Sequence, residues 1–358
     1  MEILYLLLPA IFGVGIVTSH EDIKAGKIRN VWVAIGLLYS ISVVSVLFVA
    51  AFWSGTLNYS YVFDFFANLL VVFFFSFIVW YIGLWSPGDA KIFIVYSAMI
   101  PLSIYKFGYI AFFPSSIILI NTFVPLLLFY FFKIMQKTSF EEKVVSIKKS
   151  LNPKLILSFI FFALGFAWLN GLFSFIFGIR LDFFSGLFVL GIVYLLIEKL
   201  LPNRIFEIGT LLTIFRLIFD YGNLFTFDFL YSFISIFTLC FLVRFLVIDL
   251  SSKAFSSPIN IEDLKSGMMP AEKIIKERGK YKKDHSVKTF FNLGKNRNFI
   301  HGHILSEGDV KMLRRLHSNG DIKEHTIRIH QTIPFAPFIF LGVLITIFSQ
   351  GVFLNMFY

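Results

Sequence analysis

Two aspartates, Asp22 and Asp89, stand where their carboxyl groups could do chemistry together. Asp22 follows the charge-free block 3–20, and Asp89 follows the charge-free block 65–88. Hydrolysis of a peptide bond without a metal or a covalent nucleophile needs one carboxylate to activate water and one carboxylic acid to protonate the carbonyl oxygen. Two carboxyl groups held close together suit these roles, because they cannot both ionise easily and tend to share a proton. Each acid could equally be an ordinary acid at a membrane boundary, and Asp89 could be a helix N-cap.

The residues before Asp89 favour a tight approach to Asp22. Glycine lets the backbone come close to another segment and proline stiffens a turn, so Pro87 and Gly88 could aim Asp89 at its partner. If the charge-free blocks cross a membrane, an odd number of crossings separates the N-terminus from each acid. The sequence therefore predicts that both carboxyl groups emerge on the same side.

The apolar composition predicts that these acids lie between membrane-spanning helices. Of the 358 residues, 57% are hydrophobic and only 15% are charged, whereas soluble domains usually have roughly 25% charged residues. Block 31–63 is too long for one straight helix, and Ser54, Gly55, Thr56 and Asn58 predict a loop that divides it. The charge-free blocks, each near or above the ~20 residues that cross a bilayer, are 3–20, 31–63, 65–88, 107–132, 155–179 and 329–358.

Shorter apolar runs at 90–105, 183–201, 203–219 and 229–248 bring the expected number of spans to about ten. The fold class that follows is an all-α polytopic membrane protein with a small cytoplasmic domain, which could be α+β, before the last helix. We expect a catalytic transmembrane core, a basic cytoplasmic loop, an additional four-helix bundle, a cytoplasmic soluble segment and a C-terminal transmembrane helix. Their ranges are 1–135, 136–152, 153–249, 250–332 and 333–358 respectively.

The basic residues predict the orientation of the chain. Cytoplasmic loops of membrane proteins are enriched in Lys and Arg. With the N-terminus outside, 28 of the 32 basic residues fall in inside segments. The net charge of +10 then reflects topology and gives no reason to expect a nucleic-acid partner. Met1-Glu2 carries no basic n-region, so we expect a retained first helix in a multi-pass protein of the cell membrane.

Residues 249–332 differ in character from the rest of the chain. They hold 16 basic residues, 10 acidic residues and six of the seven histidines. The alternation at 325–329, His-Thr-Ile-Arg-Ile, predicts some β-structure. The single cysteine, Cys240, excludes an intramolecular disulfide and a thiolate zinc site.

Two motifs resemble those of the type IV prepilin and preflagellin peptidases, which are membrane aspartyl proteases of the Gly-x-Gly-Asp type. Residues 22–30, Asp-Ile-Lys-Ala-Gly-Lys-Ile-Arg-Asn, resemble the first motif, in which an aspartate after the first helix precedes an Asn element that opens the second. Residues 86–91, Ser-Pro-Gly-Asp-Ala-Lys, resemble the second, Gly-x-Gly-Asp-x-Lys. Residues 333–338, Ile-Pro-Phe-Ala-Pro-Phe, are similar to an element that often begins the last helix, and 262–270 resembles a cytoplasmic segment of archaeal members.

The resemblance covers about residues 1–135 and 250–345, and leaves 153–249 without a role. It implies a substrate of the prepilin type, such as a type IV pilin or archaellin precursor, with a basic leader in the cytoplasm and a hydrophobic helix in the bilayer. Cleavage at that junction requires acids at the cytoplasmic face. The resemblance implies no metal and no other cofactor. The catalytic residues that it implies are Asp22 and Asp89, and the supporting residues are Ser86, Pro87, Gly88, Lys91, Lys24 and Asn30.

The sequence also departs from the family pattern. Ser86 replaces the first glycine, and a serine would be strained if that position needed a positive φ. The paired-cysteine zinc element of many bacterial members is absent, and so is their N-methyltransferase signature. These differences favour a peptidase-only enzyme of the archaeal type.

Other polar residues allow a bland and a sharper interpretation. His301 and His303 could be metal ligands or parts of a polar loop. Glu307-Gly308-Asp309 repeats the Gly-Asp step, either as a turn or helix cap or as a catalytic element. The lysines of 133–154 form a solvated topogenic loop or contact anionic lipid or substrate.

Two other functions remain open. A transporter or channel could use the charged residues of 153–249, where Arg216, Glu207 and Asp220 form either structural pairs or a transport pathway. A non-catalytic scaffold of a pilus system is the third possibility. A close approach of Asp22 and Asp89 favours the peptidase, whereas a continuous polar pathway through 153–249 favours the transporter.

Overall fold

The computed structural model describes residues 2–81, 85–151, 153–166, 204–243, 255–268, 270–271, 273–277, 280–284, 305–320, 325–330 and 333–354, with isolated positions between 168 and 201 and residue 322. These residues belong to two units. Unit 1 is drawn from Met1–Leu128, Ala167–Leu196 and Ile333–Tyr358, and unit 2 from Phe129–Phe166 and Ile197–Thr332.

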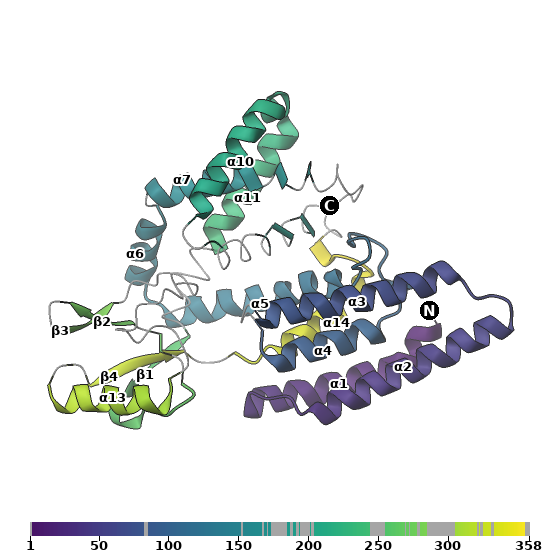
Figure 1. Cartoon of the computed structure of the whole chain (residues 1–358), viewed down its shortest axis with the longest axis horizontal. Coiled ribbons are helices and arrows are strands. Elements are labelled where there is room, and N and C mark those ends of the chain that lie inside the picture. Colours follow the sequence, from purple (N-terminus) through teal and green to yellow (C-terminus); the bar gives the residue numbers. More distant parts are fainter. Residues whose placement is uncertain are drawn as a thin grey trace. The chain divides into compact units, whose positions relative to one another are not determined.

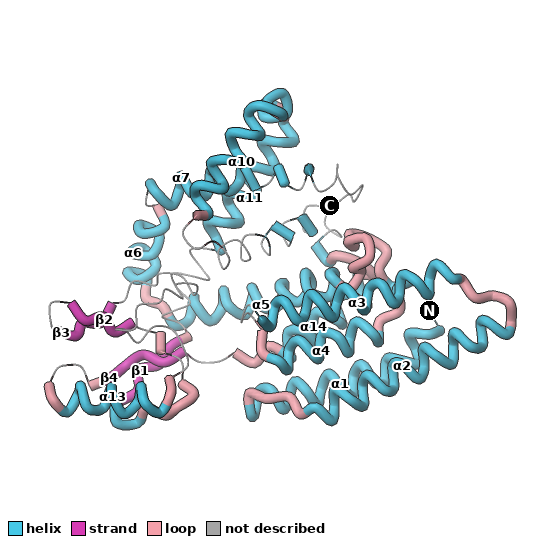
Figure 2. The backbone as a smooth tube through the Cα atoms, viewed as in Figure 1, coloured by secondary structure: helices cyan, strands magenta, loops and turns pink. Residues whose placement is uncertain are grey.

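Unit 1 is a helical bundle that contains both candidate acids. Its helices are α1 (Glu2–Ala25), α2 (Asn30–Trp53), α3 (Tyr59–Tyr81), α4 (Pro87–Met99), the first part of α5 (Ser116–Lys137) and α14 (Ala336–Ser349), with the short 3-10 turn η1 (Leu102–Ile104) after α4. Helix α4 packs against α1, α2, α3 and α14. Figures 1 and 2 show α14 alongside α4, although the whole of unit 2 separates them in the sequence.

Helix α4 forms the centre of this bundle. Nine of its thirteen residues are buried, and Ile92, Phe93, Tyr96 and Met99 are among the largest fully buried side chains of the described chain. A helix that is apolar on every side is stable only where other helices surround it. The packing around α4 therefore fixes the position of its first turn, which carries Asp89.

Small residues let the helices of unit 1 approach closely. A Cβ at Gly36 of α2 would lie 2.7 Å from a methyl carbon of Val95 in α4. A Cβ at Gly342 of α14 would lie 2.8 Å from the backbone oxygen of Ile118 in α5. Close approach of two helices at a glycine is typical of helices packed in membranes.

Buried amides add specific links between these helices. The Asn68 side chain of α3 donates to the Ser115 hydroxyl at 2.9 Å and accepts from the Ser115 backbone N–H at 3.1 Å. In α5, the Asn121 amide donates to the Thr346 hydroxyl of α14 at 3.0 Å and to the Gly351 carbonyl at 2.9 Å. Because all five of these residues are buried, loss of one partner would leave another polar group unsatisfied.

Four described helices are long and apolar enough to cross a membrane: residues Ile3–Ala25 of α1, and α2, α3 and α5. The loop expected within 31–63 is confirmed, because α2 ends at Trp53 and α3 begins at Tyr59. The run expected at 90–105 is a shorter helix, since Pro101 disfavours helical geometry at Ile100 and α4 ends at Met99. The run at 183–201 lies largely outside the described residues, so about ten spans stays a prediction.

Unit 2 includes a small α+β part and a helical part. In the α+β part, β1 (Ser256–Asn260) pairs with β4 (Thr326–His330) and β2 (Lys273–Glu277) pairs with β3 (Lys280–Asp284), both antiparallel. Helix α13 (Glu307–Ser318) and the turn η5 (Ile261–Asp263) share an apolar core with β4. The strand predicted from 325–329 is therefore confirmed.

The helical part of unit 2 contains α6 (Phe140–Ser150), α7 (Pro153–Phe161), the π-helix η2 (Phe162–Phe166), α10 (Ile205–Phe219), the turn η3 (Tyr221–Phe225) and α11 (Phe227–Val243). A π-helix shifts the backbone hydrogen bonds and leaves carbonyls available to side chains. Arg216 donates to one of these, Leu164 O, at 2.7 Å, and its Nε lies 3.5 Å from a carboxylate oxygen of Asp220. These contacts account for Arg216 and Asp220 as a structural pair. Glu207 pairs with Arg204 at 4.0 Å on the exposed surface.

We expect Gly342→Ala to destabilise the bundle by about 1–3 kcal/mol, because the added methyl group would displace α14 from α5. Thermal unfolding in detergent measures the change. Gly13→Ala is the matched control, since a Cβ at Gly13 meets no atom within 4 Å. Equal melting temperatures for the two variants would contradict close packing at Gly342.

Candidate active site

Asp22 lies in the last turn of α1, and its side chain reaches the beginning of α14. The backbone N–H of Ala336 donates to Asp22 Oδ2 at 2.9 Å. Ala336 is the first residue of α14, and the N–H groups of a first helical turn have no partner within the helix. Asp22 therefore caps α14 and binds one end of the last helix to the end of the first.

The end of α1 is fixed by Gly26. Its N–H donates to the backbone oxygen of Asp22 at 2.8 Å, and its φ of +62° is left-handed. This is the common way in which a glycine ends a helix. The Asp-Ile-Lys-Ala-Gly spacing of the first motif thus sets where the helix stops relative to the acid.

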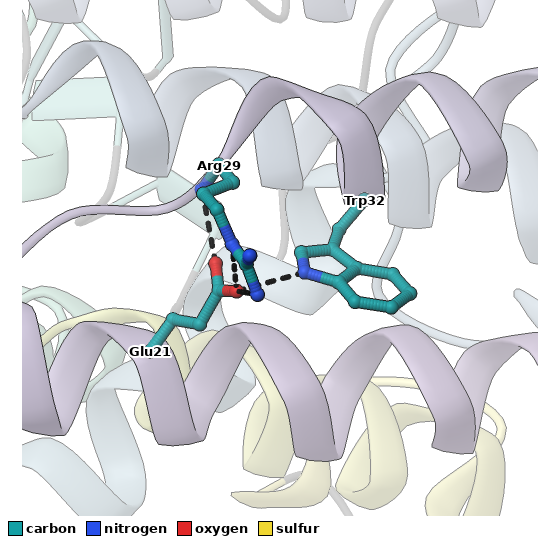
Figure 3. Close-up of polar contacts among 3 residues, drawn as sticks. All are labelled: Glu21, Arg29 and Trp32. Carbon is teal, nitrogen blue, oxygen red and sulfur yellow. Dashed lines mark hydrogen bonds and ion pairs between the residues drawn. The ribbon is translucent and has the colours of Figure 1, made fainter.

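A second acid, Glu21, holds the connection between α1 and α2, as Figure 3 shows. Its carboxylate accepts from the Arg29 backbone N–H at 3.0 Å, from the Arg29 guanidinium, and from Trp32 Nε1 at 2.8 Å. The Glu21 side chain is only 12% exposed, whereas that of Arg29 is 71% exposed. Sequence reasoning missed this contact, although an acid one residue before Asp22, with an arginine and a tryptophan across a short turn, is a visible signal.

Asp89 is the third residue of α4 and forms a capping box with Ser86. The Asp89 N–H donates to Ser86 Oγ at 3.2 Å, and the Ser86 N–H donates to Asp89 Oδ2 at 3.1 Å. Pro87 occupies the first turn, where its missing N–H costs no hydrogen bond. The Ser-x-x-Asp spacing therefore fixes both the start of α4 and one oxygen of the acid.

The geometry of Ser86 explains why a serine can replace the first glycine of the motif. Its φ is −72° and its ψ is 157°, a region that any residue adopts. The positive φ considered from the sequence is absent, and Ser86 is exposed. Its side chain acts as the N-cap, a role that glycine fills without a side-chain hydrogen bond.

Burial raises the pKa of the Asp89 carboxyl from its ordinary value of 3.8 to about 6. Loss of solvent is the largest cause; the hydrogen bonds from Ser86 oppose it, and the negative charge of Asp22 adds to it. Asp89 is 7% exposed. The charge of Asp22 is the smallest of these causes, so burial is the main reason that the pKa of Asp89 is raised.

Other predicted supporting residues bring the two motifs together. Lys91 Nζ donates to Asn30 Oδ1 at 2.9 Å, which connects the first residue of α2 with the fifth residue of α4. A Cβ at Gly88 would lie 3.4 Å from Ile28 Cδ1, so the turn before α2 packs against the turn that carries Asp89. Lys24 is exposed in the last turn of α1. The two motifs therefore supply contacts that hold the helices together, in addition to the two carboxyl groups.

Unit 2 repeats the local structure of Asp89. Ser306 and Asp309 form a capping box at the start of α13, with N–H to oxygen distances of 3.2 and 2.9 Å. The helix-cap interpretation of 307–309 is thus confirmed. Ser306 is exposed and Asp309 is half-buried, so burial distinguishes Asp89 from this second Gly-Asp step.

Within the part of the chain that the structure describes, no group of three or more His, Cys, Asp or Glu side chains could hold a metal ion. His301 and His303, considered as metal ligands from the sequence, lie outside the described residues.

One curated protein resembles most of this chain. It comes from Methanothermobacter thermautotrophicus, is 25% identical over 363 aligned positions, and shares 92% of this chain and 90% of its own length. Its name is prepilin peptidase EppA. Because the alignment covers 92% of this chain, it must include most of residues 153–249. The similarity to this relative therefore extends beyond the segments whose motifs resemble the family. No family model and no solved structure matches the chain.

We expect Asp89→Asn to be more stable than the native protein at pH 8, by up to about 3 kcal/mol. A raised pKa means that the folded state holds the proton more tightly than the unfolded chain. The native protein therefore loses stability as the pH rises from about 4 to about 6, whereas an amide there does not titrate. The melting temperature in detergent, measured between pH 4 and pH 8, gives the difference.

Asp309→Asn is the control for this experiment, because it changes the same capping position in a more exposed setting. It should not gain stability at pH 8. A pH dependence of Asp89→Asn identical to that of the native protein would contradict the assigned pKa of Asp89.

Proposed function

We propose that this protein is a membrane aspartyl endopeptidase that removes the leader from prepilin-like precursors at the cytoplasmic face of the membrane. The observation that carries the proposal is the buried Asp89 carboxyl, whose pKa is raised to about 6 mainly by burial and in the smallest part by the charge of Asp22. Paired carboxyl groups with one raised pKa are the arrangement that aspartyl hydrolysis requires. The name of the curated relative supports the choice of substrate.

The two acids take different roles in this mechanism. Asp89, whose burial favours the protonated form, donates its proton to the carbonyl oxygen of the scissile bond. Asp22 activates the attacking water: its Oδ2 is fixed by the Ala336 N–H, and its Oδ1 takes the proton of the water. When the tetrahedral intermediate collapses, Asp22 gives its proton to the leaving amine. Asp89 takes a proton back from a hydroxyl of the intermediate, which restores the starting protonation of both acids.

The location of the pair fits a substrate that crosses the membrane boundary. Asp22 lies near the end of a helix long enough to span a bilayer, and Asp89 lies at the beginning of the buried α4. In a precursor with an apolar helix and a polar leader, the junction between the two would lie at this same membrane boundary. The excess of basic residues predicts that this boundary is cytoplasmic.

We expect Asp22→Asn and Asp89→Asn each to reduce precursor cleavage by at least about a thousandfold. Water activation and carbonyl protonation act as a unit, so the double variant should be hardly slower than either single variant. Cleavage of a prepilin precursor in membranes measures this, with thermal unfolding to establish that each variant is folded. Asp309→Asn is the matched control and should cleave normally.

Near-native cleavage by either single variant would contradict the proposal. Inhibition by EDTA with recovery on addition of zinc would also contradict it, because the mechanism uses no metal ion.

We expect the kcat/KM profile to fall on the alkaline side from about pH 6, as the free enzyme loses the Asp89 proton. Ser86→Ala should move this alkaline limb to higher pH, because the hydrogen bonds from Ser86 lower the pKa of Asp89. Ser306→Ala removes the equivalent cap of α13 and should leave the limb in place. An identical shift in both variants would show that loss of a helix cap, and not the Asp89 carboxyl, controls the profile.

A further inference from the structure

Helix α6 connects two apolar helices by very short links. Only Thr138 and Ser139 separate it from α5, and only Leu151 and Asn152 separate it from α7. Two extended residues reach at most about 7 Å, whereas the eleven residues of α6 extend for about 16 Å. If α5 crosses the bilayer, α6 must therefore stay close to the surface where α5 emerges.

The beginning of α6 is well defined. Ser139 and Glu142 form a capping box: the Glu142 N–H donates to Ser139 Oγ at 3.2 Å, and the Ser139 N–H donates to Glu142 Oε2 at 3.1 Å. The cap separates α6 from α5 as a helix of its own. The direction of each α6 side chain then follows from helical geometry.

One face of α6 is apolar and uncovered. Phe140, Val144, Ile147 and Leu151 recur at intervals of four, three and four residues, which places them along one stripe of a helix. Phe140 is 80% exposed, Ile147 38% and Leu151 51%, and Val144 is half-buried. Exposed apolar stripes of this kind mark surfaces that contact another apolar phase.

Lysines border this stripe on both sides. At 100° per residue, Lys143 lies on one flank and Lys148 on the other. Lys143 also donates to the Met135 carbonyl at 3.3 Å, and Lys148 is exposed. Long lysine side chains can keep their ammonium groups at the level of lipid headgroups while the apolar residues enter the bilayer.

We propose that α6 lies in the membrane interface, with its apolar stripe among the acyl chains and Lys143 and Lys148 against anionic headgroups. Two observations favour the bilayer as the partner of this stripe. The short links hold α6 near the membrane surface, and the lysines that border the stripe can bind anionic headgroups. The helix then anchors the connection between α5 and α7 to the lipid surface. The proposal does not depend on peptidase activity.

Quenching of a fluorescent label in the full-length protein tests this arrangement. Cys240→Ser removes the only cysteine, and single cysteines at Ile147 or Val145 then carry the same label. Val145 is a matched control because it is also apolar and 49% exposed but points away from the stripe. The protein is reconstituted in phosphatidylcholine vesicles with and without phosphatidylglycerol, with iodide on both sides.

The label at Ile147 should be quenched at least about threefold more by nitroxide lipids than by iodide, and the label at Val145 the reverse. Lys143→Gln with Lys148→Gln should weaken lipid quenching at Ile147 in vesicles that contain phosphatidylglycerol. Equal quenching at both positions would overturn the proposal. Protection of the Ile147 label from both quenchers would show that protein covers the stripe, and lack of any effect of phosphatidylglycerol would overturn the anionic contact.

Discussion

Burial of α4 on every side is the constraint on which the rest of unit 1 depends. A short helix with Phe93 and Tyr96 fully buried needs neighbours on all sides, and α1, α2, α3 and α14 supply them. Close approach requires small residues, which explains Gly36 opposite Val95. The same burial removes solvent from Asp89 at the start of the helix. The packing of the neighbouring helices around α4 therefore also raises the pKa of Asp89.

The other half of the site depends on the last helix. Asp22 reaches the first free N–H of α14, and Trp85, just before the Asp89 turn, lies with its ring 6.0 Å from that of Phe335, just before α14. The turns at 26–29, 85–89 and 333–336 therefore meet at one end of the bundle. A displacement of α14 would therefore disturb both acids, because Asp22 is hydrogen-bonded to Ala336 and Trp85, in the turn before Asp89, packs against Phe335.

The two Ser-x-Gly-Asp sequences separate local structure from environment. Ser86 with Asp89 and Ser306 with Asp309 form the same capping box at similar backbone angles. A capping box satisfies the backbone of a helix start whether or not the site has a function. Asp89 differs because α4 enters the core of a helical bundle, whereas α13 lies on a small α+β surface with only Val310 and Leu313 buried.

The sequence by itself determined the apolar segments, the break near Gly55 and the strand at 325–329. Each of these depends on residues close together in the chain, through hydrophobic periodicity or a glycine turn. It also drew attention to Asp22 and Asp89 by their position and neighbours. Sequence spacing could not supply the contact of Asp22 with Ala336 or of Glu21 with Trp32, since the first joins residues far apart in the chain and the second depends on the path of the turn.

Asp89 and Asp309 stand in similar Ser-x-Gly-Asp sequences, and only the tertiary structure decided that Asp89 is the buried one. The pKa of a carboxyl depends on the solvent and charges around it, and these come from helices α1, α2, α3 and α14, which are distant in sequence. The tertiary structure likewise decided that the Ser86 hydroxyl caps α4 and that Arg216 donates a hydrogen bond to a carbonyl of the π-helix η2. In each case the outcome depends on which atoms fill the surrounding space, and packing between distant segments determines that.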